Sequence, residues 1–330
     1  MILVAGLSPA WQQIAQLKQL RVGAVNRAMD VRWCASGKVL NVGLALHRLR
    51  GLAADSPPVQ VISVAGGPAG EELRAHCARL QMPVEWIGTR APTRVCTTLL
   101  DRETGQTTEI VENAHPIEPS ELAAFEEAFR QQAREAKMVV LTGSFPAGTP
   151  VDFYARLARH TTALLVVDAQ GAPLAATWPV QPAVIKPNRE ELGNTLGRAL
   201  ETSAQLRAAL AECQARGARG VVISQGAGPV LVASGTETRW LHPPAVPVVN
   251  PIGSGDCLAA GLAWGLARGL SLPESARWGV AAAADNVSQL DPADLAAPRV
   301  RALFDQVRVE PSSPGNEPAA SEAVFRVEPD

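Results

Sequence analysis

Short apolar runs alternate with segments of helical periodicity along most of this chain. The runs are rich in Val, Ile and Leu and have the sequences MILVAGL, VQVISVA, KMVVLTGS, ALLVVDA, AVIKPN and GVVISQG. Between them, segments such as 38–49, 71–80 and 120–136 place apolar residues at helical spacing, with Ser120 as the expected N-cap of the third. Apolar strands that alternate with helices are typical of parallel sheets covered on both sides. We therefore expect an α/β fold with a mostly parallel central sheet flanked by helices on both faces.

Two segments, 12–33 and 94–112, interrupt this alternation. Both have the pattern of β-hairpins with polar turns, and Thr104 and Gly105 mark the tip of the second. We expect them to form a small β-sheet that projects over the site as a lid, within one domain of residues 1–309. Residues 310–330 carry too much proline, serine and acid to sustain a core, so we predict a disordered tail there.

The composition argues against several classes of partner. The formal net charge is −2, so the chain has no basic excess for binding nucleic acid. The apolar runs are too short to span a membrane, and the N-terminus lacks the basic leader of a secretion signal. The five cysteines are scattered without a CxxC pair, which is typical of reduced thiols in the cytoplasm. We expect a cytoplasmic protein that acts on a small molecule.

The segment 250–260, NPIGSGDCLAA, places two glycines and a carboxylate at the start of an apolar helical run. Because Gly253 and Gly255 lack Cβ atoms, the backbone can turn several amides toward one anion, beside the positive end of the helix. Asp256 would then lie where a substrate hydroxyl arrives, which is the arrangement that phosphate transfer needs. The alternative interpretation is that Asp256 only caps the helix.

Other strand ends carry polar or glycine-containing motifs: SGKVLN at 36–41, GSFPAG at 143–148, KPNREE at 186–191 and SQGAG at 224–228. Ligands of parallel sheets bind at the carboxyl ends of the strands, so we expect these motifs to meet. In order and spacing they resemble the ribokinase-like PfkB family of carbohydrate kinases, over nearly the whole chain to about residue 306. The NPxGSGD form, the TRV and TEIVE segments and VNR at 25–27 resemble its 1-phosphofructokinase and tagatose-6-phosphate kinase branch.

This resemblance implies an ATP- and Mg²⁺-dependent kinase that phosphorylates a hydroxyl of a sugar phosphate to give a bisphosphate. The acceptor would be of the fructose 1-phosphate, fructose 6-phosphate or tagatose 6-phosphate type. Asp256 would be the catalytic base, and the amides of Gly253, Ser254 and Gly255 would hold the migrating phosphoryl group. The resemblance also implies that Lys186, Asn188, Ser224, Gly226 and Asn286 bind the nucleotide, and that Gln12, Arg27, Gly37, Lys38, Asn41, Arg94 and Ser144 bind the sugar phosphate.

Several of these residues have plainer interpretations. Asn188 and Glu191 match the family's NxxE element, which holds Mg²⁺ through water, but an Asn N-cap with a first-turn acid has the same pattern. Arg27 and Arg94 suit a phosphate group, although each alone would be an ordinary surface charge. Asn286, on a helix expected at 276–289, would by itself be a solvent-facing polar residue.

Three positions depart from the family pattern. The family's NPAxD motif is SPAWQ here, so the neutral amide of Gln12 replaces a charged hydrogen-bond acceptor. Val39 and Pro229 stand where the family has glycine, and a β-branched residue at 39 would crowd the site and resist a positive φ angle. Because Gln12 and Val39 lie on the acceptor side, we expect altered sugar specificity.

Two other functions remain open on the same fold. One is a kinase of an unphosphorylated sugar or nucleoside, which would give Arg27, Lys38 and Arg94 nothing to neutralise. The other is a noncatalytic sugar or nucleotide sensor, which Gln12 favours and Asp256 opposes. The exposed strand edges of the lid suit a homodimer. The chain has neither a GxGxxG after its first strand nor a GxxxxGK[ST] motif, so a dehydrogenase and a P-loop ATPase are disfavoured.

Overall fold

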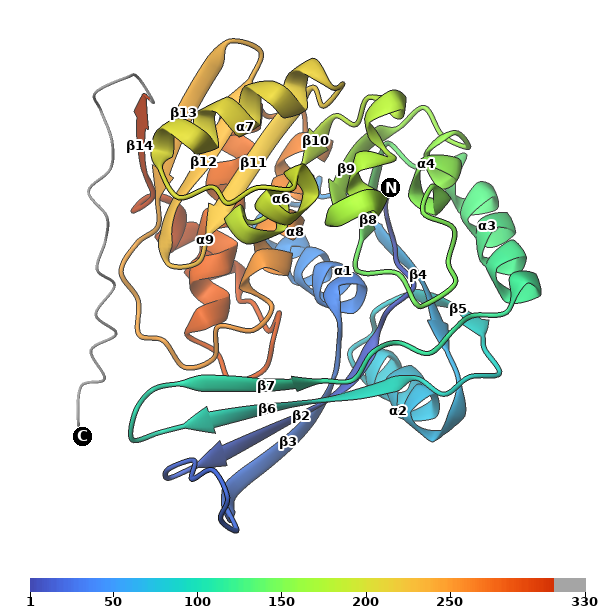
Figure 1. Cartoon of the computed structure of the whole chain (residues 1–330), viewed down its shortest axis with the longest axis vertical. Coiled ribbons are helices and arrows are strands. Elements are labelled where there is room, and N and C mark those ends of the chain that lie inside the picture. Colours follow the sequence, from blue (N-terminus) through green and yellow to red (C-terminus); the bar gives the residue numbers. More distant parts are fainter. Residues whose placement is uncertain (312–330) are drawn as a thin grey trace.

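The computed structural model describes residues 1–311, and its centre is a ten-stranded sheet (Figure 1). The strands are β1 (Ile2–Ala5), β4 (Val59–Ala65), β5 (Val84–Gly88), β8 (Met138–Thr142), β9 (Leu164–Asp168), β10 (Val184–Ile185), β11 (Gly220–Gln225), β12 (Gly228–Ser234), β13 (Glu237–His242) and β14 (Arg308–Pro311). Their order is β14-β13-β12-β11-β10-β9-β8-β1-β4-β5. From β5 to β11 all neighbours are parallel, while β12, β13 and β14 form an antiparallel edge.

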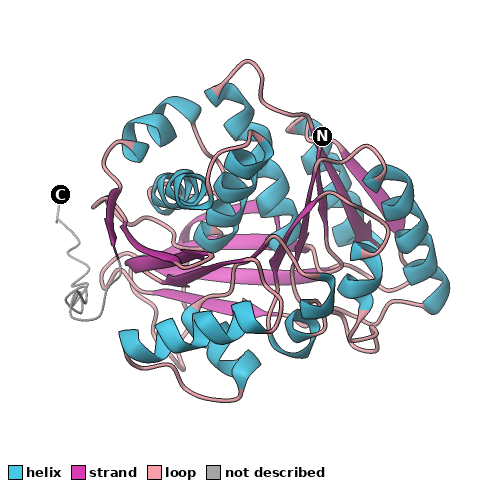
Figure 2. Ribbon diagram, turned by 90° about the horizontal axis from the view of Figure 1, so that it is seen from above, coloured by secondary structure: helices cyan, strands magenta, loops and turns pink. Residues whose placement is uncertain are grey.

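Helices cover both faces of this sheet (Figure 2). One face carries α1 (Lys38–Leu49), α2 (Gly67–Arg79), α8 (Ser254–Ala267), α9 (Leu272–Val287) and α10 (Ala297–Phe304). The other carries α3 (Pro119–Ala133), α4 (Phe153–Ala158), α5 (Gly171–Ala175), α6 (Arg189–Leu196) and α7 (Ser203–Ala215). Two short 3₁₀ helices are η1 (Arg50–Leu52) and η2 (Trp178–Val180).

Side-chain alternation along the central strands explains why two layers of helices are needed. In β1, Ile2 and Val4 join the core beneath α1 and α8, whereas Leu3 and Ala5 join the core beneath α3 and α4. All four side chains are fully buried. A strand that is apolar on both faces must be covered on both faces, so the predicted two-sided sheet is confirmed.

A separate four-stranded sheet forms the lid. It consists of β2 (Ala10–Leu17), β3 (Ala28–Ser36), β6 (Arg94–Asp101) and β7 (Thr107–Val111), in the order β3-β2-β6-β7. The two hairpins are joined through parallel pairing of β2 with β6. Figure 1 shows this sheet projecting below the central sheet, as a layer of its own.

Two local expectations need correction. Helix α3 begins at Pro119 and is capped by Glu118, whose capping box with Glu121 replaces the expected Ser120 cap. Residues 310 and 311, which we assigned to the tail, belong to β14, which pairs with β13. The rest of the predicted tail, 312–330, lies outside the described residues. Within residues 1–311, no helix combines the length and apolarity needed to cross a membrane.

Helix α8, which begins in the glycine-rich segment 250–260, packs on α9 through glycines. A Cβ built on Gly261 would lie 2.6 Å from the Cα of Gly279, so any larger residue must push the two helices apart. We predict that Gly261→Ala lowers the free energy of unfolding by about 2 kcal/mol in urea denaturation, despite the better helix propensity of alanine. Gly88→Ala is the matched control because nothing lies within 4 Å of its Cβ position. Equal stability of the two variants would contradict this account of the helix pair.

Candidate functional site

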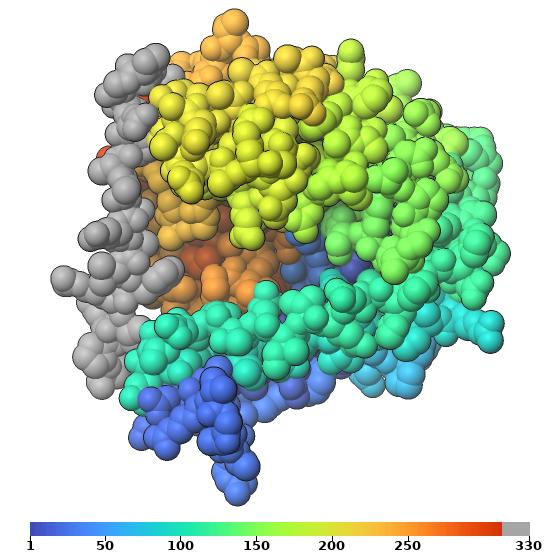
Figure 3. Space-filling view, viewed as in Figure 1, coloured from blue at the N-terminus to red at the C-terminus, as the bar shows by residue number. Residues whose placement is uncertain are grey.

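A cavity of about 330 Å³ lies at the carboxyl ends of the central strands. Its volume is in the range of small-molecule sites, and its position is the one at which parallel sheets bind ligands. Figure 3 shows the molecule hollowed here, between the lid below and the segments that carry α6 and α4 above. The lining residues are Ser8, Lys38, Arg94, Gly143, Ser144, Phe145, Ala169, Gln170 and Pro173.

The glycine-rich loop before α8 has the geometry of an anion cradle. Gly253 is the N-cap of α8 and has a φ of 82°, a conformation that glycine adopts without strain. The amide of Ser254 donates to the carbonyl of Pro251 at 3.3 Å. The amides of Gly253 and Gly255 make no hydrogen bond within residues 1–311, so they are available to a ligand at the positive end of the helix.

Asp256 lies at the start of α8, in a buried position. The residue is 7% exposed, and its Oδ2 accepts a 2.7 Å hydrogen bond from Nδ2 of Asn41 in α1. Burial raises the pKa of Asp256 to about 6, because the charged form is desolvated, while the nearby Lys38 acts in the opposite direction. A carboxylate with this pKa is ionised at neutral pH and more basic than an ordinary aspartate, as a general base should be.

Beside Asp256, a network of ion pairs connects two lysines and two carboxylates that lie at strand ends and at helix starts. Nζ of Lys38 lies 3.3 Å from Oδ1 of Asp168 and 2.9 Å from Oε1 of Glu191. Nζ of Lys186 lies 3.3 Å from the same Oδ1 of Asp168. Burial opposes both charges, but the carboxylates raise the pKa of Lys38 and the two lysines lower that of Asp168. Lys38 and Asp168 are therefore both charged at neutral pH.

Lys186 also brings positive charge to the anion cradle. A Cβ on Gly255 would lie 3.9 Å from its Nζ atom, and the Lys186 side chain is almost fully buried. The ammonium group therefore lies beside the free amides rather than in solvent. A contact of Lys186 with the phosphates of a nucleotide stays a prediction.

The NxxE element combines helix capping with this network of ion pairs. Asn188 is the N-cap of α6: its side chain accepts from the amide of Glu191 at 2.8 Å, and the Glu191 carboxylate accepts from the amide of Asn188 at 2.9 Å. The second carboxylate oxygen of Glu191 pairs with Lys38. The interpretation of Asn188 as a helix N-cap is thus correct, and the same cap also places the carboxylate of Glu191 next to Lys38. The described residues contain no group of three or more His, Cys, Asp or Glu side chains placed to hold a metal ion.

On the acceptor side, Gly37 is required where the chain enters α1. It has a φ of 87°, and a Cβ there would lie 2.8 Å from the carbonyl oxygen of Ser8. Val39, which we expected to crowd the site, lies inside α1, is buried, and faces Gly6, whose Cβ position is 2.9 Å from its own Cβ. It is not among the described residues with positive φ, so the strain that we expected is absent.

Gln12 is buried in the lid and its amide is already engaged. Nε2 donates to Oγ1 of Thr98 on β6 at 2.7 Å. In register, Gln12 lies between Cys34 on β3 and Cys96 on β6, so its neighbours on this face are weakly polar. The lid therefore presents no carboxylate at this position.

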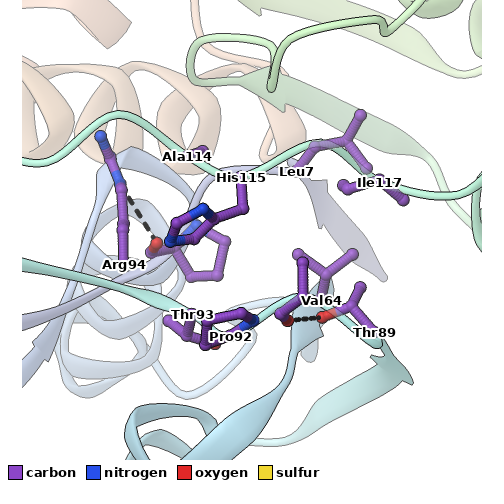
Figure 4. Close-up of a pocket in the computed structure, with 11 residues that line it drawn as sticks. Leu7, Val64, Thr89, Pro92, Thr93, Arg94, Ala114, His115 and Ile117 are labelled. Carbon is purple, nitrogen blue, oxygen red and sulfur yellow. Dashed lines mark hydrogen bonds between the residues drawn. The ribbon is translucent and has the colours of Figure 1, made fainter.

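The two arginines occupy different places. Arg94 lines the cavity and donates to the carbonyls of Ser8 at 3.1 Å, Pro9 at 3.3 Å and Glu112 at 3.2 Å, which fixes the guanidinium at the base of the lid. Behind it lies a hollow of only about 20 Å³, where Figure 4 shows His115 next to Arg94. Arg27 is exposed and directly precedes β3, nine residues before Ser36, or roughly 30 Å at the rise of a strand. Within a single chain, Arg27 is therefore not among the residues that line the cavity.

The remaining predicted residues lie around the same edge. Oγ of Ser144 lies 3.4 Å from Oγ of Ser8 at the cavity wall. Ser224, in β11, forms a parallel bridge with Asn188, and Gly226 has a φ of 59° in the turn that follows. Asn286 is not solvent-facing: it is buried, and Nδ2 donates to the carbonyl of Ile252 at 2.9 Å. Its amide supports the glycine-rich loop from behind.

Sequence reasoning missed Asp168, the fully buried carboxylate shared by both lysines. The available signal was a single acid at the end of the apolar run ALLVVDA, at the edge where the other motifs were expected to meet. It also missed Thr98, which holds Gln12 in place. That pairing depends on which lid strands are neighbours, and the sequence alone does not show this.

Comparison with known proteins identifies what this arrangement is similar to. A family model described as pfkB family carbohydrate kinase matches residues 10–298. A candidate phosphofructokinase from Staphylococcus aureus is 25% identical with a TM-score of 0.75, over 94% of this chain and 99% of that one. Phosphofructokinase-2 from Escherichia coli, solved in complex with fructose-6-phosphate, is 24% identical with a TM-score of 0.81, over 92% and 98%. A candidate 1-phosphofructokinase from Thermotoga maritima is 19% identical with a TM-score of 0.85, over 95% and 100%. These matches confirm the predicted fold class.

The raised pKa of Asp256 makes a prediction about stability. A carboxyl group whose pKa is higher in the folded state stabilises the fold below its ordinary pKa of 3.8, and this contribution is lost as the pH rises through about 6. Asp256→Asn should therefore stabilise the protein at pH 8 by about 2–3 kcal/mol more than at pH 4 in urea denaturation. Asp305→Asn, at an exposed position, is the control. If Asp256→Asn changed the free energy of unfolding equally at pH 4 and pH 8, burial of the charged carboxylate would not destabilise the protein.

Proposed function

We propose that this chain, which belongs to the pfkB family of carbohydrate kinases, transfers the γ-phosphoryl group of ATP to a hydroxyl of a sugar phosphate and so forms a bisphosphate. The family resemblance found in the sequence is thereby confirmed, and the chain is a sugar kinase. The observation that carries the proposal is the pair of free glycine amides next to a buried, basic carboxylate. A noncatalytic sensor would have no use for that combination.

The transfer needs little covalent help from the protein. The oxygen of the acceptor hydroxyl forms a bond to the γ-phosphorus while Asp256 accepts the proton of that hydroxyl. At the same time, the bond between the γ-phosphorus and the bridging oxygen of ADP breaks. The amides of Gly253 and Gly255 and the ammonium of Lys186 stabilise the negative charge of the migrating group. The proton stays on Asp256 until the products leave.

Mg²⁺ is expected to accompany ATP. When bound, it neutralises charge on the nucleotide phosphates. Both carboxylate oxygens of Glu191 are already engaged, one by Lys38 and one by the amide of Asn188, so we propose that Asn188 and Glu191 contact the ion through its waters. Oxygen donors of this kind fit a hard cation that keeps part of its hydration shell.

The cavity favours a phosphorylated acceptor over a neutral sugar or nucleoside. Lys38 and Arg94 both line it, and Ser8 and Ser144 add hydroxyl groups. The related Escherichia coli phosphofructokinase-2 is described in complex with fructose-6-phosphate. We propose a ketohexose phosphate of the fructose 1-phosphate, fructose 6-phosphate or tagatose 6-phosphate type, with specificity altered by the neutral, Thr98-bound amide of Gln12.

The outer face of the lid supports a homodimer. Val31, Trp33 and Ile110 are exposed apolar residues of β3 and β7, and Val22 and Val25 are exposed in the loop between β2 and β3. Such residues suit burial against a second copy. Arg27 lies in the same region, so in a dimer we propose that it reaches the acceptor phosphate in the partner's cavity. The Escherichia coli relative is described as a tetramer in an inhibited form.

We also propose a cytoplasmic location, which the buried, free cysteines of residues 1–311 support.

The assignment of the base is tested by Asp256→Asn. We predict that kcat falls by about 10³-fold, while ATP binding measured by calorimetry changes less than about twofold. The wild-type protein is first screened for ATP consumption with sugar 1-phosphates, sugar 6-phosphates and unphosphorylated sugars. Turnover of the variant within tenfold of wild type would exclude Asp256 as the base, and wild-type turnover only with neutral sugars would exclude the proposed acceptor.

The role of Arg27 is tested by mixing two defective proteins. Arg27→Ala keeps its own Asp256, and Asp256→Asn keeps its own Arg27, so a mixed dimer contains one complete site. Random mixing in equal amounts should restore about a quarter of wild-type activity from two nearly inactive parents. Activity no higher than the mean of the parents would show that Arg27 does not act across a dimer.

A further inference from the structure

We propose that Leu290 is a positioning residue that seats the lid and couples it to the glycine-rich loop, a proposal that rests on the kinase function proposed above. The inner face of the lid carries a small apolar cluster of Ile14, Cys34 and Leu100, which come from three different strands and are all buried. Leu290, from the segment between α9 and α10, packs against this cluster. It therefore inserts from the main body into the underside of the lid.

The backbone carbonyl of Leu290 is hydrogen-bonded to Asn250, at the start of the glycine-rich loop. Nδ2 of Asn250 donates to the carbonyl of Leu290 at 2.8 Å, and Oδ1 of Asn250 accepts from the amide of Ile252 at 3.1 Å. The Cβ of Pro292 lies 3.1 Å from the position of a Cβ on Gly253. A single segment thus touches the lid with the side chain of Leu290, and touches the glycine-rich loop with the carbonyl of Leu290 and the ring of Pro292.

Asn286 makes this connection rigid. Its Oδ1 accepts from the amide of Ala293 at 2.7 Å, while its Nδ2 donates to the carbonyl of Ile252 at 2.9 Å. Ala293 is fully buried and has a φ of 62°, a left-handed conformation that an L-residue keeps only where its surroundings determine it. Displacement of the segment would therefore be transmitted to the loop rather than absorbed.

The ionic contact at the same place is weaker. NH1 of Arg32 on the lid lies 3.8 Å from Oδ2 of Asp291, with the two side chains 54% and 36% exposed. Exposed pairs of this kind contribute little to stability. Of the two contacts that this segment makes with the lid, the apolar contact of Leu290 is therefore the stronger.

Loss of this contact has a distinctive consequence. A loosened lid binds the acceptor less firmly and admits water to the γ-phosphoryl group. Water can then attack the γ-phosphorus in place of the sugar hydroxyl: the bond to the bridging oxygen of ADP breaks, Asp256 accepts a proton of the water, and ADP and inorganic phosphate leave. We expect Leu290→Ala to raise KM for the acceptor about tenfold and to increase ATP hydrolysis without acceptor, with KM for ATP little changed. Leu290→Met, which refills the contact, should restore both.

The experiment compares Leu290→Ala with Leu270→Ala, a leucine of similar half-burial that packs on the main core away from the lid. Hydrogen exchange of the amides in β2 and β6 is measured on the full-length proteins, together with acceptor KM and acceptor-free ATP hydrolysis. Faster lid exchange in Leu290→Ala alone, with the kinetic changes, supports the proposal. Equal exchange in the two variants, or faster exchange with unchanged kinetics, overturns it. The exchange readout needs no kinase activity, so failure of the wild-type screen would be recognised separately.

Discussion

The site depends on one buried carboxylate that holds two lysines. Asp168 ends β9, and its Oδ1 lies 3.3 Å from both Lys38, at the start of α1, and Lys186, just after β10. Removing one partner of such a group leaves an uncompensated buried charge, which is strongly destabilising. The arrangement therefore fixes the relative positions of α1, β9 and β10, and with them the cradle amides beside Lys186. The same carboxylate helps to keep the Lys38 ammonium charged at the cavity wall.

Asp256 differs from Asp168, because its charged form destabilises the folded state. Its burial raises its pKa, so the ionised form that removes a proton is also the form that destabilises the protein. Asn41 and the two lysines offset this only in part. Proteins commonly keep such conflicts at working sites. This conflict supports the proposed role of Asp256 as the base, because a residue that only capped the helix would gain nothing from burial of its charge.

The sequence predicted the elements better than their contacts. Runs such as VQVISVA and the helix at 38–49 could be placed because apolar periodicity decides them locally, and α1 has the expected bounds. Asp168 and Thr98 could not be found in this way, since their roles depend on residues 130 and 86 positions away. The consequence expected for Val39 failed for the same kind of reason: its backbone is helical and it packs on Gly6, neither of which follows from a motif position.

The parallel pairing of β2 with β6 has a consequence for how the molecule is made. These strands are separated in the chain by β3, α1, β4, α2 and β5, so the lid cannot close on itself as a simple hairpin. Pairing over such a sequence distance is slow, because the intervening units must first be arranged. On the ribosome, β2 and β3 would emerge with an open edge that awaits its neighbour, and this edge is exposed to chaperones or to a neighbouring nascent chain. The lid sheet can therefore be completed only after β4 and β5 have been made, although all four of its strands lie within residues 10–111.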